Sequence, residues 1–216
     1  MGKSLKSLIS DLFRKRSVGP SPVFEPHHII MTIFILKREG GLVGRYRLVK
    51  ELGLGEAAVK TLLKHLRRLG LVGVRPRRGH FLTELGNKVA DEIMSRIKAI
   101  KEVKGFEEIA VGPVNVVCHL RGLADIVKSG VEQRDAAIMA GAMGATTIIS
   151  KGGKLFLAPG DYEVPEKVSR ILRKEFDIME GDVLIVGSAD NLINAQNGAI
   201  AAALTLLLSD SSPCSR

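Results

Sequence analysis

Cysteine and long apolar runs are scarce in this sequence, and their scarcity excludes several classes of protein. The two cysteines among the 216 residues, Cys118 and Cys214, show no CxxC or Cys/His ligand spacing, so we expect reduced thiols and no structural metal. The longest apolar run, Ala199 to Leu208, is about half of the roughly 20 residues that span a bilayer, which predicts no membrane span. Charged residues such as Lys6 and Asp11 interrupt the N-terminus, so we expect no signal peptide and a cytoplasmic location.

Aromatic residues and catalytic motifs are also rare. Aromatics make up 4% of the chain and tryptophan is absent, which leaves few platforms for stacking on single-stranded RNA. The sequence contains no GxSxG, HExxH, P-loop or GxGxxG motif. Cys118 and His119 are neighbours, but neighbours on a strand face opposite sides, and His27 and His28 lack companion ligands. We therefore expect no catalytic residue, no metal and no cofactor.

Positive charge is in excess and is concentrated in the first half of the chain. Residues 1–104 contain 22 of the 32 Lys and Arg but 9 of the 23 Asp and Glu, a net charge of +13 within the total of +9. Residues 105–216 contain the other 10 and 14, a net charge of −4. This asymmetry favours a nucleic-acid-binding first half, with simple solvation of the surface by Lys and Arg as the alternative.

Apolar periodicity divides the first half into a short helix with a linker, over residues 1–25, and a domain over residues 26–104. Leu5–Phe13 has the spacing of an amphipathic helix, and glycines and prolines follow it. The domain is predicted to contain helices over His27–Arg38, Gly44–Leu52, Glu56–Leu69 and Glu84–Ile100, the last capped by Thr83, and a hairpin over Leu71–Arg75 and His80–Thr83.

The predicted helix over Glu56–Leu69 is apolar on one face and cationic on the other. Lys60, Lys64 and Arg67 recur at the i, i+4, i+7 spacing of a single helix face. Between Gly40 and His80, ten Lys and Arg stand against two Glu. Neutralising the phosphates of a nucleic acid requires a surplus of this kind on one face.

The stretch GRYRLVKELGLGEAAVKTLLKHLRRLGLVGVRPRRGHFLTELGNKVADEI resembles the winged helix-turn-helix regulators of bacteria and archaea. The shared features are a short helix, a turn, a cationic helix that ends in LGLV, a basic hairpin and an LTELG helix start. The stretch departs from the pattern at Gly55, where such regulators often carry a Ser or Thr cap. The whole chain resembles an archaeal family that joins this domain to an uncharacterised C-terminal domain.

The resemblance implies which side chains would contact DNA. A recognition helix over about residues 56–69 would enter the major groove, and a wing over about residues 71–83 would lie on the backbone or in the minor groove. A winged helix that binds protein is the alternative. The residues implied at base edges are Ala57, Lys60, Thr61 and Lys64, and those implied at phosphates are Arg45, Arg47, Arg67, Arg75, Arg77, Arg78 and His80.

Beyond residue 104, the pattern predicts an α+β domain over residues 105–208 and a loose tail over residues 209–216. Strands and helices alternate without a strict βαβ rhythm, so α/β is the alternative class. The predicted elements are strand structure within Ile109–Leu120, a helix over Val131–Met143, a hairpin over Thr146–Ser150 and Lys154–Ala158, a helix over Val164–Phe176, a strand over Asp182–Gly187 and a helix over Asn191–Leu208.

Two polar segments of this second domain could bind a small-molecule effector. The first segment, which holds Ser188, Asp190, Asn191 and Asn194, follows a predicted buried strand and opens a helix, where backbone amides converge. The alternative is that Ser188 or Asp190 only caps this helix. The second segment combines the charged residues Arg134 and Asp135 with small residues around Gly144, which allow another backbone or a ligand to approach closely. The candidate effector residues are Arg134, Asp135, Gly144, Ser188, Asp190, Asn191 and Asn194.

These patterns together predict a sequence-specific DNA-binding transcriptional regulator whose second domain senses an effector or supplies an assembly contact. We expect a homodimer, because one winged helix contacts few base pairs and two-fold symmetry doubles the interface. The alternatives are a small-metabolite enzyme with an accessory winged helix, and a chromatin- or RNA-binding protein without operator specificity. Convergence of Asp135, Asp190 and Asn191 in one closed pocket would favour the enzyme.

Overall fold

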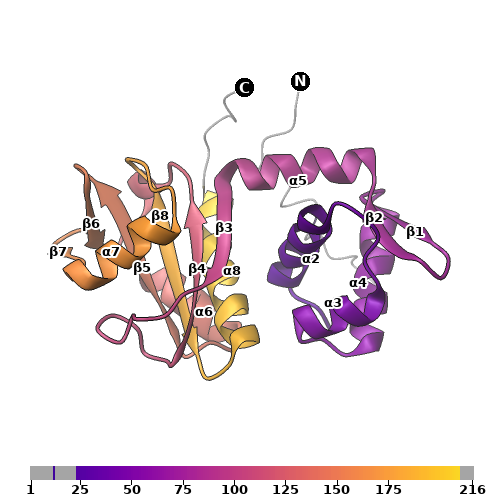
Figure 1. The fold of residues 1–216 in the computed structure, drawn as a ribbon, viewed down its shortest axis with the longest axis horizontal. Coiled ribbons are helices and arrows are strands. Elements are labelled where there is room, and N and C mark those ends of the chain that lie inside the picture. Colours follow the sequence, from indigo (N-terminus) through magenta and orange to yellow (C-terminus); the bar gives the residue numbers. More distant parts are fainter. Residues whose placement is uncertain (1–11, 13–22, 210–216) are drawn as a thin grey trace. The chain divides into compact units, whose positions relative to one another are not determined.

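The computed structural model describes Leu12 and residues 23–209, which form seven α-helices and two antiparallel β-sheets (Figure 1). The chain divides into two compact units, a first unit up to Met94 and a second unit from Ser95. The predicted helix over Leu5–Phe13, apart from Leu12, lies outside the described residues, as does the predicted tail beyond residue 209. The mixture of helices and antiparallel strands confirms the predicted α+β class.

Three helices open the first unit, and their apolar faces form its core. α2 (Pro26–Glu39) has proline in its first turn and ends at Gly40, whose left-handed φ of 61° suits glycine. α3 (Arg45–Leu52) is the short second helix. The third helix, α4 (Glu56–Arg68), turns one face inward and buries Ala58, Val59, Leu62, Leu63 and Leu66. The three helices confirm the predictions from apolar spacing.

A two-stranded sheet follows α4 and is tied to the segment before α3. β1 (Val72–Arg75) and β2 (Gly79–Leu82) pair as the predicted antiparallel hairpin. The N–H groups of Val43 and His80 each donate to the other's carbonyl oxygen at 2.8 Å. A Cβ on Gly79 would lie 2.6 Å from the Val43 carbonyl oxygen, so this close approach requires glycine. The hairpin is thereby held beside the start of α3.

The fourth helix of the first unit leads directly into a strand of the second. α5 (Glu84–Arg96) begins as predicted, since the Thr83 hydroxyl accepts a hydrogen bond from the backbone N–H three residues later at 3.0 Å. The predicted end of this helix at Ile100 is wrong. The helix ends earlier, and β3 (Ile97–Glu102) pairs antiparallel with β4 (Val114–Leu120). Apolar spacing continues across the junction and therefore does not mark the change from helix to strand.

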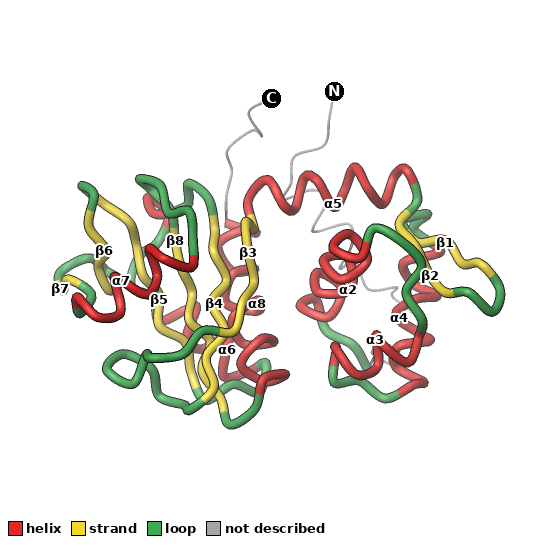
Figure 2. The backbone as a smooth tube through the Cα atoms, viewed as in Figure 1, coloured by secondary structure: helices red, strands yellow, loops and turns green. Residues whose placement is uncertain are grey.

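The second unit is built on a six-stranded sheet with strand order β3-β4-β8-β5-β6-β7 (Figure 2). Its pairing is antiparallel throughout, which excludes the alternative α/β class. The other strands are β5 (Gly144–Lys151), β6 (Lys154–Leu157), β7 (Tyr162–Glu163) and β8 (Val183–Ala189).

Helices cover both faces of this sheet. α6 (Val131–Met139) and α8 (Leu192–Ser209) pack on each other and on the central strands. α7 (Glu166–Glu175) packs on the opposite face, where Leu184 and Val186 of β8 join its core cluster. The sheet is consequently buried on both sides at β8.

Two predicted elements of this unit are longer than the structure shows. The helix predicted over Val131–Met143 ends at Met139, because Gly141 takes a left-handed φ of 93° and β5 begins at Gly144. The strand structure predicted within Ile109–Leu120 is a single strand that begins only at Val114.

Among the described residues, α8 alone has the length and hydropathy of a helix that could cross a membrane, and 56% of it is buried inside the second unit. A Cβ on Gly187 of β8 would lie 2.4 Å from the Ala195 carbonyl oxygen, and one on Gly198 would lie 2.4 Å from the Ala142 Cβ. The small residues of α8 thus serve close packing on the sheet and on the end of α6, as in the core of a globular domain.

A buried carboxylate joins three segments of the second unit. Asp182, at the start of β8, is fully buried, and its side chain accepts a hydrogen bond from His119 Nε2 at 2.7 Å. The N–H groups of Gly122 and Met179 also donate to it, at 3.1 Å and 2.9 Å. A buried donor left without its acceptor costs about 1–3 kcal/mol. The Asp182 carboxylate therefore holds in place the loop that follows β4 and the loop that precedes β8.

Asp182→Ala is expected to lower the free energy of unfolding by about 3 kcal/mol or more, because it leaves several buried donors unsatisfied. Denaturant titration measures the change. The matched control is Asp177→Ala, whose carboxylate is 85% exposed and lies 3.5 Å from Arg121. We expect that control to change stability by less than about 1 kcal/mol. Equal effects of the two substitutions would contradict a structural role for the Asp182 carboxylate.

Candidate nucleic-acid interface

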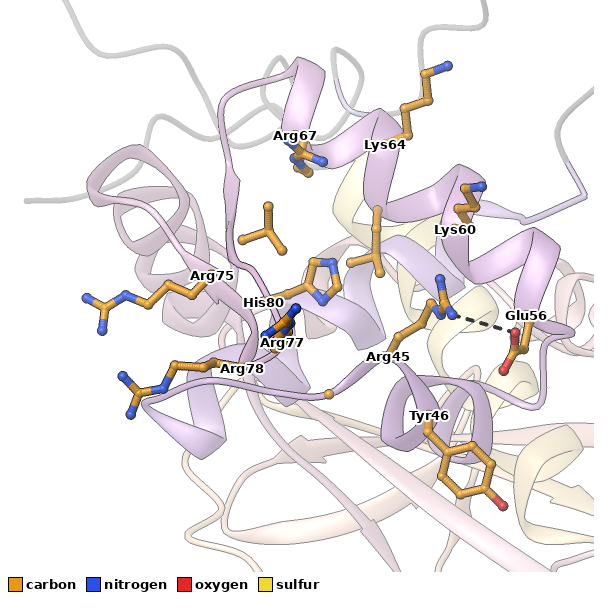
Figure 3. A pocket seen from close by; sticks show the side chains of 14 residues that line it. Arg45, Tyr46, Glu56, Lys60, Lys64, Arg67, Arg75, Arg77, Arg78 and His80 are labelled. Atoms are coloured by element: carbon orange, nitrogen blue, oxygen red, sulfur yellow. Dashed lines mark ion pairs between the residues drawn. The ribbon is translucent and has the colours of Figure 1, made fainter.

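A cleft of about 650 Å³ opens in the first unit between α3, α4 and the hairpin (Figure 3). We call it the basic cleft, because seven of its side chains are Lys or Arg and one is acidic. Its lining consists of Gly44, Arg45 and Tyr46 at α3, Glu56, Lys60, Leu63, Lys64 and Arg67 on α4, and Val74, Arg75, Arg77, Arg78, Gly79 and His80 on the hairpin.

The cations on α4 follow from its helical period. Lys60, Lys64 and Arg67 are exposed, while Leu62 and Leu66 between them are buried. Side chains three and four residues apart share one helix face, so the three cations form a stripe along the cleft (Figure 3). The structure therefore gathers three of the predicted DNA-binding residues along one wall.

The hairpin supplies three more cations from its tip. The Arg78 N–H donates to the Arg75 carbonyl oxygen at 3.0 Å and closes the turn. Arg77 takes a left-handed φ of 63°, which is uncommon outside glycine. Figure 3 shows the side chains of Arg75 and Arg78 extending outward from the hairpin, with the Arg75 guanidinium 5.8 Å from the centre of the Phe81 ring. The tip thus presents a cluster of positive charge beside α4.

Arg45 crosses from α3 toward the start of α4. Its guanidinium lies 3.7 Å from a carboxylate oxygen of Glu56, and both side chains are about half exposed or more. An exposed pair at this distance contributes little to stability. Arg45 therefore keeps its capacity to bind another anion.

His80, for which a phosphate contact is predicted, lies in the cleft, where its surroundings disfavour a positive charge on the imidazole. Its Nδ1 is buried and has no hydrogen-bond partner among the described residues. Burial lowers the pKa of His80 below its ordinary value of 6.5, and the nearby cations Arg67 and Arg45 lower it further. A neutral imidazole at pH 7 can accept or donate a hydrogen bond but does not attract phosphate by charge.

Arg47, for which a phosphate contact is predicted, lies outside the lining of the cleft. Its guanidinium donates to Glu39 at 2.7 and 2.8 Å and to Glu51 at 2.7 Å, and Glu51 also accepts from Arg38. Glu51 stands one turn after Arg47 on α3, where an i, i+4 ion pair forms readily. Arg38 and Arg47 are thus paired with Glu39 and Glu51, so Arg47 has its ion-pair partners within its own unit.

Two further predicted residues lie on α4 outside the cleft lining. Ala57 and Thr61 are exposed, and the Thr61 hydroxyl donates to the Ala57 carbonyl oxygen at 2.9 Å. Sequence reasoning missed Tyr46, Glu56 and Leu63, which do line the cleft. Tyr46 could have been noticed as an aromatic residue between two arginines, but the place of Leu63 depends on the hairpin approaching α4.

The residues proposed for an effector in the second unit fall into two groups. Gly144 pairs with Ser188 across β5 and β8, close to the start of α8, whereas Arg134 and Asp135 lie on the exposed face of α6. The Ser188 hydroxyl is buried and donates to Asn115 Oδ1 at 2.7 Å. Asn191 Oδ1 accepts from the Asn194 N–H at 3.0 Å, so Asn191, not Ser188 or Asp190, caps α8. Arg134 and Asp135 form an exposed ion pair with each other on α6. Asp190 is exposed, and Gly144 is buried.

Two further side chains with reactive groups, Cys118 and His27, are buried. Burial raises the pKa of Cys118 to about 12, which keeps this thiol protonated. His27 is buried, and burial followed by the charge of His28 lowers its pKa to about 3. Residues 23–209 contain no group of three His, Cys, Asp or Glu placed to hold a metal ion.

The two units correspond to two separately recognised domains. Residues 26–88 match the PH0730-like N-terminal domain, and residues 111–206 match a domain of unknown function, DUF4443. The chain is similar to the solved structure of "Hypothetical protein PH0730 from Pyrococcus horikoshii OT3", with 25% sequence identity and a TM-score of 0.70 over 88% of this chain and 96% of that one. A comparison with curated proteins gave no match. The predicted resemblance to a two-domain archaeal family is confirmed to this extent, and the names of these domains and of the solved structure state no activity.

We expect the pKa of His80 in the full-length protein to be below 6.5, because its imidazole is partly buried beside Arg67 and Arg45. NMR titration between about pH 4 and pH 8, with the signal assigned through His80→Gln, measures it. Arg67→Ala should raise the value, since one neighbouring cation is removed. A pKa at or above 6.5 in the unsubstituted protein would show that the cleft does not hold this side chain neutral.

Proposed function

We propose that the first unit is a winged helix-turn-helix that binds double-stranded DNA and that the protein is a transcriptional regulator. The observation that carries this proposal is the basic cleft, whose lining holds seven Lys and Arg from α3, α4 and the hairpin and a single carboxylate. In this proposal, α4 is the recognition helix and the β1–β2 hairpin is the wing. As a DNA-binding regulator, the protein would act in the cytoplasm.

The dimensions of the elements support duplex DNA as the ligand. The 13 residues of α4 give a helix of about 20 Å, and one exposed helix of ordinary diameter fits the major groove. The hairpin tip stands beside it, where an adjacent backbone or minor groove would lie. Tyr46 is the one Phe, Tyr or Trp in the cleft lining, so stacking of unpaired bases contributes little to this surface.

Charge pairing distinguishes the cleft from a merely solvated surface. Arg38 and Arg47 on the neighbouring surface are matched by Glu39 and Glu51. By contrast, none of the cleft's cations except Arg45 forms an ion pair with an acid among the described residues. Cations without an acidic partner, placed on facing elements, can neutralise DNA phosphates and so release the counterions condensed on them. This contrast favours nucleic acid over surface solvation or an acid-matched protein contact.

The second unit is assigned to sensing or assembly in this proposal. A homodimer would place two recognition helices on two half-sites, and the molar mass of the full-length protein by light scattering tests it. The enzyme alternative loses support because Asp135, Asp190 and Asn191 are all exposed and none lies within a closed pocket.

Replacing Arg67 and Arg77 together with Ala should weaken binding to duplex DNA and reduce its salt dependence. Each lost phosphate contact lowers the slope of log K against log salt by about 0.9, so the double variant should lose about 2 units of slope. Gel-shift or fluorescence titration at several salt concentrations measures it. The matched control replaces Lys50 and Lys88, two exposed lysines of the same unit outside the cleft. Equal losses in both variants would contradict a localised interface.

A further inference from the structure

Glu56 is the single carboxylate in the lining of the basic cleft, and its side chain is 65% exposed. It occupies the first residue of α4, where its charge suits the positive end of the helix. Its described partner is Arg45, at 3.7 Å, which is too long for a hydrogen bond. The carboxylate oxygens therefore keep their lone pairs available to another donor.

A carboxylate in this position opposes the binding of a polyanion. It lies beside Arg45 at one end of a cleft whose seven cations would attract phosphate, and it repels the same phosphate. When a recognition helix enters the major groove, its N-terminal residues contact base edges. Glu56 would thus meet the bases, where hydrogen-bond donors are available, and Arg67 near the other end of α4 would meet the backbone.

We infer that Glu56 is a specificity-determining residue, which accepts a hydrogen bond from the exocyclic amino group of a cytosine in the major groove. This inference rests on the proposed function. Cytosine is the base that presents an amino donor without an adjacent acceptor at that edge, and carboxylates pair with it. Against other base pairs, the unpaired carboxylate repels the acceptors at the groove edge.

The alternative is that Glu56 stabilises α4 through the helix dipole and its ion pair alone. Glu84 is a matched control for that role, because it is the first residue of α5 in the same unit. Its side chain is 86% exposed and pairs with Lys88 at 2.8 Å. Glu84→Gln removes the same charge from the same helical position outside the cleft, so it reports any general effect of charge or helix stability.

The test is selection of bound sequences from a randomised duplex library by the full-length protein, Glu56→Gln, Glu56→Ala and Glu84→Gln. We expect the unsubstituted protein and Glu84→Gln to enrich the same site, with a preference on the order of tenfold for C·G at one position. Both Glu56 variants should lose that preference and keep the others. Glu56→Gln should gain adenine at the same position, since glutamine pairs with adenine.

The outcomes separate this inference from the proposed function. If the unsubstituted protein enriches a site and both Glu56 variants enrich the same site with the same preferences, Glu56 does not contact a base and the inference is overturned. The same conclusion follows if the enriched site has no C·G preference. If the unsubstituted protein enriches no sequence, the proposed sequence-specific function fails as well. Melting temperatures equal to that of Glu84→Gln confirm that the Glu56 variants are folded.

Discussion

Unmatched positive charge, held on one side of a small helical unit, is the constraint on which the rest of the account depends. Seven cations repel one another across the basic cleft and so disfavour its folded form. The buried face of α4 opposes this repulsion, since Val59, Leu62 and Leu66 are fully excluded from solvent. The same helix thus stabilises the unit with one face and presents the cations with the other.

The hairpin completes the cleft through backbone contacts, so its position does not depend on its charged side chains. The mutual hydrogen bonds of Val43 and His80 join β2 to the segment that leads into α3. Burial, and then the charges of Arg67 and Arg45, lower the pKa of His80 and so favour its neutral form. A neutral residue at the base of the cleft limits the repulsion among the cations around it.

Much of the first unit could be predicted from sequence because local signals determine it. Apolar spacing marks α2, α3 and α4, Gly40 ends a helix, and Thr83 starts one. Roles that depend on distant partners could not be predicted. Arg47 has the same local pattern as Arg45, and only the fold brings Glu39 to it.

The second unit shows the same division between local and distant determinants. Its hairpin and helices follow from turns and periodicity, but its candidate effector residues rest on polarity, small size and a place at the start of a helix, which do not identify their neighbours. Ser188 proved to satisfy Asn115 inside the sheet, and the small residues Gly187 and Gly198 serve helix packing. A polar or small residue in a sequence fits a ligand site and an internal contact equally well until its neighbours are known.

The central claim, that the basic cleft is where duplex DNA binds, is tested most directly by backbone amide NMR of the full-length protein titrated with a duplex. The account predicts that the largest shift changes fall on the exposed face of α4 and on the turn between β1 and β2, with little change around Arg38 and Arg47. Changes confined to the second unit, or centred on the acid-matched surface, would contradict it.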